Sequence, residues 1–209
     1  MSNSSLRDFL NSKFIKDNPR ALDADFEFEL LGRLNPEERR QAESILLSRL
    51  NAGHDPRALL ALAEIGSERA IEPLLRYRER IRSESAALSR DGLILQATLA
   101  LWRISRDPAL VVPDLLALLR EAQMGNARRE AAVALADFAR REVADGLLVA
   151  LRDSLGMVRE QAAMTLLQIC DVDAPELPEM LLRRDETRNA EAITALEALV
   201  NAFPWPEQT

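Results

Sequence analysis

The sequence predicts an all-α protein, a short right-handed α-solenoid of about five stacked antiparallel helix pairs with an irregular N-terminal cap. Its 209 residues include 36 Leu and 31 Ala, which are strong helix formers. Only 7 Gly and 9 aromatic residues are present, and a β-sandwich would need more aromatic and β-branched residues. Two recurring apolar patterns complete the argument, one for each helix of a pair.

The first helix of each pair is predicted by an alanine, a leucine four positions later and another large apolar residue three positions after that. This i, i+4, i+7 spacing places the three side chains on one face of an α-helix. The alanines of successive copies are 39, 34, 31 and 30 positions apart. The five copies are Ala58/Leu62/Ile65, Ala97/Leu101/Ile104, Ala131/Leu135/Phe138, Ala162/Leu166/Ile169 and Ala192/Leu196/Leu199.

A second apolar stripe follows each of the first four copies and predicts an antiparallel second helix. The stripes are Ile71/Leu74/Leu75, Val112/Leu115/Leu116, Ala144/Leu147/Leu148 and Leu177/Met180/Leu181. Pro73, Pro113 and Pro178 lie near the predicted helix starts, where a missing N–H costs no hydrogen bond. Turn or cap residues separate the two helices at 66–67, 106–108, 140–142 and 171–175. A lone pair cannot bury its apolar face, so the pairs are expected to stack.

Residues 1–55 are expected to form the N-terminal cap, with helices over 4–15 and 21–34. Asn35 is expected to cap a further helix that begins at Pro36 and runs to about Asn51. Asp55 is expected to cap the next helix. The repeats then occupy residues 56–203, and residues 204–209 form a tail whose tryptophan either folds back on the last helix or stays mobile.

This pattern resembles the HEAT-repeat family of armadillo-type α-solenoids, in its short bacterial form. The best copy is residues 158–182, beginning Val158-Arg159-Glu160-Gln161-Ala162-Ala163, and residues 127–151 match almost as well. The resemblance covers residues 56–200 and implies a surface for binding other proteins. The stretch 80–90 departs from it by lengthening one link, and tetratricopeptide arrays fit less well.

The residues for catalysis are mostly missing. The single His54 and the single Cys170 are far apart in the predicted array, so no nucleophile–base pair is expected. One cysteine cannot build a cysteine zinc site, and no glycine-rich phosphate loop occurs. The acidic segment 171–182 has no glycine at its sixth position and no glutamate at its twelfth, unlike a calcium loop. We therefore predict no enzyme activity, no cofactor and no metal.

The net charge of −7 is concentrated at the C-terminal end, where residues 151–209 carry 5 basic and 11 acidic groups. This balance disfavours nucleic-acid binding by phosphate neutralisation. It indicates either a solvated capping repeat or an acidic surface that attracts a basic protein. Trp102 is either a core residue or an interface anchor. The candidate partner-binding residues are Trp102, Asp171, Asp173, Glu176, Glu179, Asp185 and Glu186.

The prediction for function is a non-catalytic, bacterial, cytoplasmic protein-binding module. Its most concrete form is an immunity or antitoxin-type inhibitor, monomeric or in a 1:1 complex, that occludes a basic toxin domain such as a nuclease. No partner nucleic acid and no membrane span are expected, since no long uncharged apolar window occurs. The alternatives are a HEAT-repeat scaffold or adaptor without inhibitory role, and an accessory similar to the phycobilin lyases.

Overall fold

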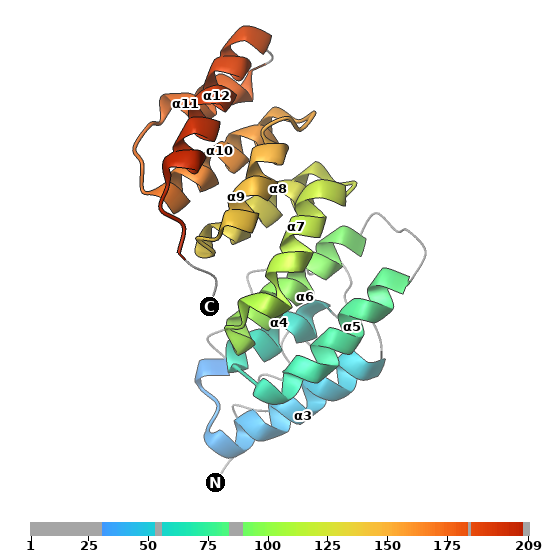
Figure 1. The fold of residues 1–209 in the computed structure, drawn as a ribbon. Coiled ribbons are helices and arrows are strands. Elements are labelled where there is room, and N and C mark those ends of the chain that lie inside the picture. Colours follow the sequence, from blue (N-terminus) through green and yellow to red (C-terminus); the bar gives the residue numbers. More distant parts are fainter. Residues whose placement is uncertain (1–30, 53–55, 84–89, 184, 207–209) are drawn as a thin grey trace. The chain divides into compact units, whose positions relative to one another are not determined.

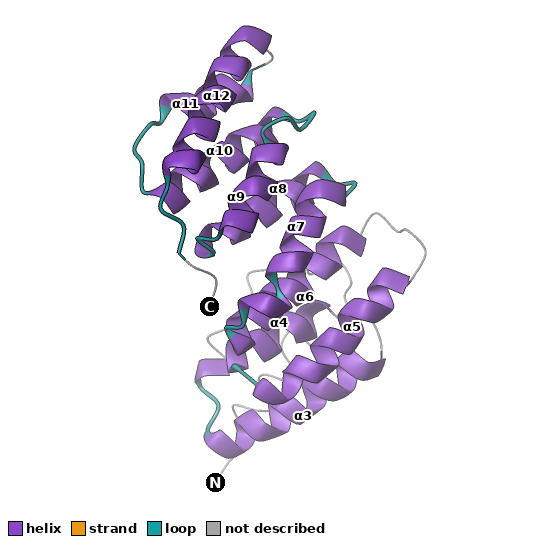
Figure 2. Cartoon of the chain, in the orientation of Figure 1, coloured by secondary structure: helices purple, strands orange, loops and turns teal. Residues whose placement is uncertain are grey.

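Every regular element in the described part of the chain is a helix, as the computed structural model in Figures 1 and 2 shows. The structure describes residues 31–52, 56–83, 90–183 and 185–206. Helices α3 to α12 span Pro36–Ala52, Pro56–Ile65, Ile71–Ser83, Arg90–Ser105, Val112–Glu121, Gly125–Ala134, Arg141–Ala150, Gly156–Cys170, Glu176–Leu182 and Glu186–Ala202. Short 3-10 turns η2, η3 and η4 lie at Glu68–Ala70, Pro108–Leu110 and Leu135–Asp137.

The chain divides into two compact units. Unit 1 contains residues 1–85 and 96–107, and unit 2 contains residues 86–95 and 108–209. The described helices of unit 1 are α3, α4, α5 and the second part of α6. Unit 2 holds the beginning of α6 and all of α7 to α12. The neighbouring helices within each unit pack on one another, and the predicted all-α solenoid is confirmed.

The first predicted stripe forms the core of both units. The alanine and the leucine of all five copies have no exposed surface: Ala58, Leu62, Ala97, Leu101, Ala131, Leu135, Ala162, Leu166, Ala192 and Leu196. An alanine at this position allows a neighbouring helix to approach closely. The third residue of the stripe is less constant, because Phe138 and Ile169 are buried while Ile65, Ile104 and Leu199 are partly exposed.

The second stripe also marks helices, α5, α7, α9 and α11. Each buries one leucine almost completely: Leu74, Leu115, Leu147 and Leu181. The apolar residues on either side of these leucines are mixed, with Val112 and Ala144 buried and Leu116 and Leu148 partly exposed. The second helices therefore contribute a narrower buried face than the first helices do.

The start of α3 is confirmed in detail. The Asn35 side-chain oxygen accepts hydrogen bonds from the backbone N–H groups of Glu37 and Glu38, at 3.0 and 2.9 Å. The Glu38 carboxylate in turn accepts from the Asn35 N–H at 3.0 Å. This reciprocal arrangement is a capping box, and it satisfies donors that the first helical turn leaves free. The helix predicted over 4–15, most of that predicted over 21–34, His54 and the Asp55 cap lie outside the described residues.

The predicted turns are present, with one shift. Helix α10 ends at Cys170 and is capped by Asp171, whose φ of 53° is left-handed. The N–H of Val172 donates to the carbonyl of Leu167 at 3.0 Å. The turn expected at 140–142 lies instead at 138–140. The reason is that α8 passes directly into η4, which ends at Asp137. The backbone of Arg140 is extended, so α9 begins at Arg141.

Two arginines at equivalent positions of α8 and α10 join consecutive helix pairs. Arg128 forms a bidentate ion pair with Asp153, at 2.7 and 3.0 Å, and also donates to the carbonyl of Ala122 at 2.7 Å. Arg159 donates to three backbone carbonyls, those of Asp153 (2.8 Å), Leu181 (3.0 Å) and Arg183 (3.3 Å). These carbonyls lie at or near helix ends, where the intrahelical acceptors lack partners. Each guanidinium therefore ties the end of one helix to its neighbours.

Helix α12 closes the array of unit 2. It packs on α10 and α11, as expected of a fifth first helix, and also lies against the second helix α9 (Figure 1). Arg152 bonds Glu197 at 2.8 Å across the α9–α12 contact. The tail folds back, since the Trp205 indole N–H donates to the carbonyl of Val200 at 2.9 Å. Of the two alternatives for the tail tryptophan, the structure shows the folded-back one.

Candidate functional site

The six predicted acidic residues lie on α11 and just before and after it. Asp171 and Asp173 precede the helix, and Glu176 and Glu179 lie on it. Asp185 caps the next helix, α12, and Glu186 is its first residue. Glu176 and Glu179 are three residues apart and so share a helix face. All six side chains are exposed. We call this set the acidic strip: Asp171, Asp173, Glu176, Glu179, Asp185 and Glu186.

The charge of the acidic strip is mostly uncompensated. Within the described residues, Asp185 is the strip member that has an ion pair, at 3.7 Å from Arg188, and it also caps α12 by accepting the Arg188 N–H at 3.2 Å. The other five carboxylates have no cationic partner there. Some acids on other helices differ, because Glu72, Glu121 and Glu130 each pair with an arginine on the same helix. The strip is thus a local excess of negative charge in water.

Trp102 lies in unit 1, whereas the acidic strip lies in unit 2. Its side chain is half-buried on α6, and the Arg106 guanidinium stands 5.4 Å from the centre of its ring. This distance is within the range of a cation–π interaction. The arrangement gives the indole a partner inside the chain.

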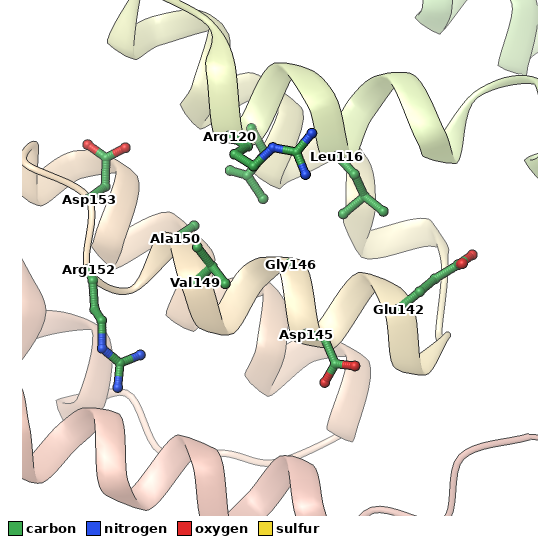
Figure 3. A pocket seen from close by; sticks show the side chains of 10 residues that line it. Leu116, Arg120, Glu142, Asp145, Gly146, Val149, Ala150, Arg152 and Asp153 are labelled. Carbon is green, nitrogen blue, oxygen red and sulfur yellow. The ribbon is translucent and has the colours of Figure 1, made fainter.

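Sequence reasoning did not predict a hollow of about 650 Å³ between α7 and α9 (Figure 3). We call it the α7–α9 groove. Its lining residues are Leu116, Leu119 and Arg120 from α7, with Glu142, Asp145, Gly146, Val149, Ala150, Arg152 and Asp153 from α9 and the turn after it. A sequence signal existed, because residues 142, 145, 149 and 152 recur every three or four positions, the spacing of one helix face.

Two features make the centre of the groove apolar. Val149 is 64% exposed. Gly146 has no side chain, and a Cβ added there would lie 2.5 Å from the Cδ2 atom of Leu116. Glycine at 146 therefore lets Leu116 reach the α9 backbone.

The charged side chains of the groove fall into two kinds. The first kind forms exposed ion pairs: Arg120 with Glu121 (2.5 Å), Arg152 with Glu197 (2.8 Å), Asp145 with Arg141 (2.8 Å) and Glu142 with Arg140 (3.6 Å). Asp153 is different, because only 12% of its side chain is exposed and it forms an ion pair with the equally buried Arg128. Burial raises the pKa of Asp153, but the hydrogen bonds from Arg128 and from the backbone outweigh this and keep the pKa below 3.8.

The described residues contain no cluster of side chains able to hold a metal ion. Cys170 is buried at the end of α10, and burial raises the pKa of its thiol. It is a small apolar core residue. None of the described helices has the length and apolar character needed to cross a membrane.

Fold and surface together define a helical-repeat protein, in which stacked antiparallel pairs present charged and apolar side chains outward. Residues 112–197, from α7 into α12, match the family model for HEAT repeats. This segment is therefore built of HEAT repeats, and the predicted resemblance is confirmed. The match supports a role in protein interaction or scaffolding. No curated protein matches the chain significantly.

Proposed function

We propose that this chain is a non-catalytic protein-binding module of the bacterial cytoplasm. In its most concrete form it is an immunity or antitoxin-type inhibitor that covers a basic surface of a toxin, such as a nuclease, in a 1:1 complex. The observation that carries the proposal is the acidic strip, in which five of six exposed carboxylates have no cationic partner among the described residues.

The physical basis is electrostatic complementarity. Exposed like charges that lack counter-cations repel one another weakly in water, and a basic partner relieves this repulsion on binding. Such a surface also accelerates association, because it attracts an oppositely charged protein over about a Debye length, roughly 8 Å at physiological salt. Glu176 and Glu179 are held on a helix, so little ordering is needed when a partner binds.

The experiment is a tagged pull-down from the native cell, washed at low and high salt, with three forms of the protein. The first is the wild type. The second removes four strip charges by Asp171→Asn, Asp173→Asn, Glu176→Gln and Glu179→Gln. The control removes four charges elsewhere by Glu37→Gln, Glu72→Gln, Glu79→Gln and Glu130→Gln. Four neutralised acids change the net charge from −7 to −3 in both variants.

We expect the wild type and the control to retain one stoichiometric basic protein that high salt releases and that is toxic when expressed alone. The strip variant should lose it. Equal retention by the strip variant and the control would contradict the proposal, as would a partner that high salt does not release.

A scaffold or adaptor is the second candidate function. The α7–α9 groove favours it, because it is a further open surface outside the acidic strip. The discriminating measurement is stoichiometry by light scattering on the purified complex. Two different partners bound at once indicate a scaffold, whereas one partner whose activity is abolished indicates an inhibitor.

A further inference from the structure

We propose that an apolar ridge beside the acidic strip receives an amphipathic segment of the basic partner protein, whose apolar side chains cover the ridge while its cations meet the strip. This inference rests on the proposed function and deepens it, because it states the chemistry of the partner's contact segment. The apolar ridge is a set of exposed apolar residues at the junctions between successive helix pairs of unit 2: Met124, Leu155, Met157 and Leu182.

The four ridge side chains belong to the small set of large apolar residues that the structure describes as exposed. Met124 is 40% exposed and Leu155 39%, and they directly precede α8 and α10. Met157, the second residue of α10, is 37% exposed, and Leu182, the last residue of α11, is 48% exposed. Neighbouring exposed apolar residues mark interaction sites, whereas single scattered ones need no explanation.

Two glycines bring the ridge residues of successive helix pairs into contact. Gly125 and Gly156 are the first residues of α8 and α10. A Cβ added at Gly125 would clash with the Cδ1 atom of Leu155, and a Cβ added at Gly156 would clash with the carbonyl oxygen of Leu182. Leu155 therefore lies against the start of α8, and the backbone of Leu182 lies against the start of α10. The ridge residues thus follow one another across both junctions.

The backbone that carries the ridge is held in place from inside the fold. The buried Arg159 guanidinium donates to the carbonyls of the residues on either side of Leu182, at 3.0 and 3.3 Å. It also donates to the carbonyl of Asp153 at 2.8 Å, and the Asp153 carboxylate accepts from the Leu155 N–H at 2.8 Å. A partner that binds here therefore has little of this surface left to order.

The charge around Leu182 favours a basic occupant. Leu182 comes three residues after Glu179 and three residues before Asp185, so the ridge meets the acidic strip at this point. Residues 171–191 carry seven acidic and three basic groups. A segment that places an apolar side chain on Leu182 brings its neighbouring side chains next to this negative surplus, where lysine or arginine is complementary.

The same charge disfavours the other occupants of an exposed apolar surface. A second copy that placed its ridge on this one through a two-fold axis would bring the two acidic strips together. Nucleic acids and anionic lipid surfaces are repelled for the same reason. The ridge is also too small to hold a dimer by itself, because a stable interface uses about 20–30 residues on each side. A basic polypeptide is the occupant that satisfies both the ridge and the strip.

The test measures the binding of synthetic peptides to the full chain by fluorescence anisotropy at low and high salt. The first peptide has about 15 residues, enough to form a helix, with leucines on one face and lysines on the other. The second peptide replaces the lysines by glutamate, and the third replaces the leucines by glutamine.

The ridge variant is Met157→Gln, Leu182→Gln, which removes apolar surface and leaves every charge in place. The matched control is Val133→Gln, Met164→Gln, which removes two apolar side chains that are 41% and 49% exposed on α8 and α10 outside the ridge. Thermal unfolding by circular dichroism verifies that both variants fold.

We expect the leucine–lysine peptide to bind the wild type at least tenfold more tightly than either of the other peptides. The ridge variant should weaken this binding at least fivefold, and the matched control at most twofold. High salt should weaken binding to the wild type and to the ridge variant by the same factor, because both retain the strip charges. The strip variant should lose most of this salt dependence.

Four results would overturn the inference. The first is that the leucine–lysine peptide does not bind, and the second is that the leucine–glutamate peptide binds as tightly. The third is an equal loss of affinity in the ridge variant and the matched control. The fourth is a wild-type dimer, detected by light scattering, that the ridge variant abolishes, which would assign the ridge to a second copy. The proposed function is tested separately, since it fails if the strip variant retains the native partner in the pull-down.

Discussion

Replacement of Arg159 in α10 should markedly destabilise unit 2. The residue is 7% exposed, and its guanidinium has no carboxylate partner within the described residues. All three of its hydrogen bonds go to backbone carbonyls, at 2.8, 3.0 and 3.3 Å. The substitution Arg159→Met keeps the length of the side chain and most of its packing, while it removes all three donors at once.

The size of the effect follows from these bonds. A hydrogen bond from a charged donor contributes about 1.5–3 kcal/mol, so three of them give an upper value of about 5–9 kcal/mol. Part of this is offset, because the variant no longer has to desolvate a guanidinium, which costs several kcal/mol. We expect a net loss of about 2–4 kcal/mol in the free energy of unfolding, within the range for broken buried networks.

The assay is urea unfolding of the wild type and two variants, followed by circular dichroism. Arg129→Met is the matched control, because Arg129 is the next residue of α8 after the equivalent arginine, is 41% exposed and pairs with Glu130 at 2.8 Å. It should change the free energy of unfolding by less than about 0.5 kcal/mol. If Arg159→Met lost no more than this control, the reasoning that the three carbonyl bonds join the helix pairs would be refuted.

Three further predictions each concern one residue. Gly156→Ala should destabilise the protein by about 1–3 kcal/mol, because the new Cβ would lie 2.3 Å from the carbonyl oxygen of Leu182. The control is Gly92→Ala, whose Cβ would meet nothing within 4 Å and which should be neutral or slightly stabilising. Thermal unfolding of the two variants compares them. The folded-state pKa of Asp153 is lowered, so its contribution to stability is present above the unfolded value near 3.8 and is lost as pH falls through the folded value. The stability gap between wild type and Asp153→Asn, from urea unfolding, should therefore be smaller at pH 2 than at pH 7, and an equal gap at both would contradict this. Cys170, buried and with a raised pKa, should react with iodoacetamide at least tenfold more slowly in the native protein than in urea, as mass spectrometry of the adduct would show.

The helices were predictable because their core positions repeat. An alanine and a leucine four residues apart mark a face that is buried in every copy, and this periodicity depends on the α-helix alone. The capping box at Asn35 was partly predictable for the same reason, since it is a local contact. The shifted turn before α9 was not, because the early closure of α8 through η4 depends on how that helix packs.

The surfaces were harder to predict. The acidic strip was visible as a charge excess, but its lack of counter-cations depends on where each arginine side chain points. The α7–α9 groove joins residues 30 or more positions apart, such as Leu116 and Gly146, and no local pattern shows that a glycine faces a leucine. Arg159 belongs to the family motif, but its three carbonyl acceptors come from segments that only the fold brings together.

The arginine contacts also indicate how such an array could be lengthened by duplication of a repeat. Gly125 and Gly156 occupy the same place at the start of their helices, as Arg128 and Arg159 do three residues later, and each pair is 31 positions apart. A duplication of residues 125–155, joined in frame, would carry its own glycine and its own arginine to the new junction. The closing helix α12 would stay at the end. Lengthening by whole units therefore preserves the chemistry of each junction.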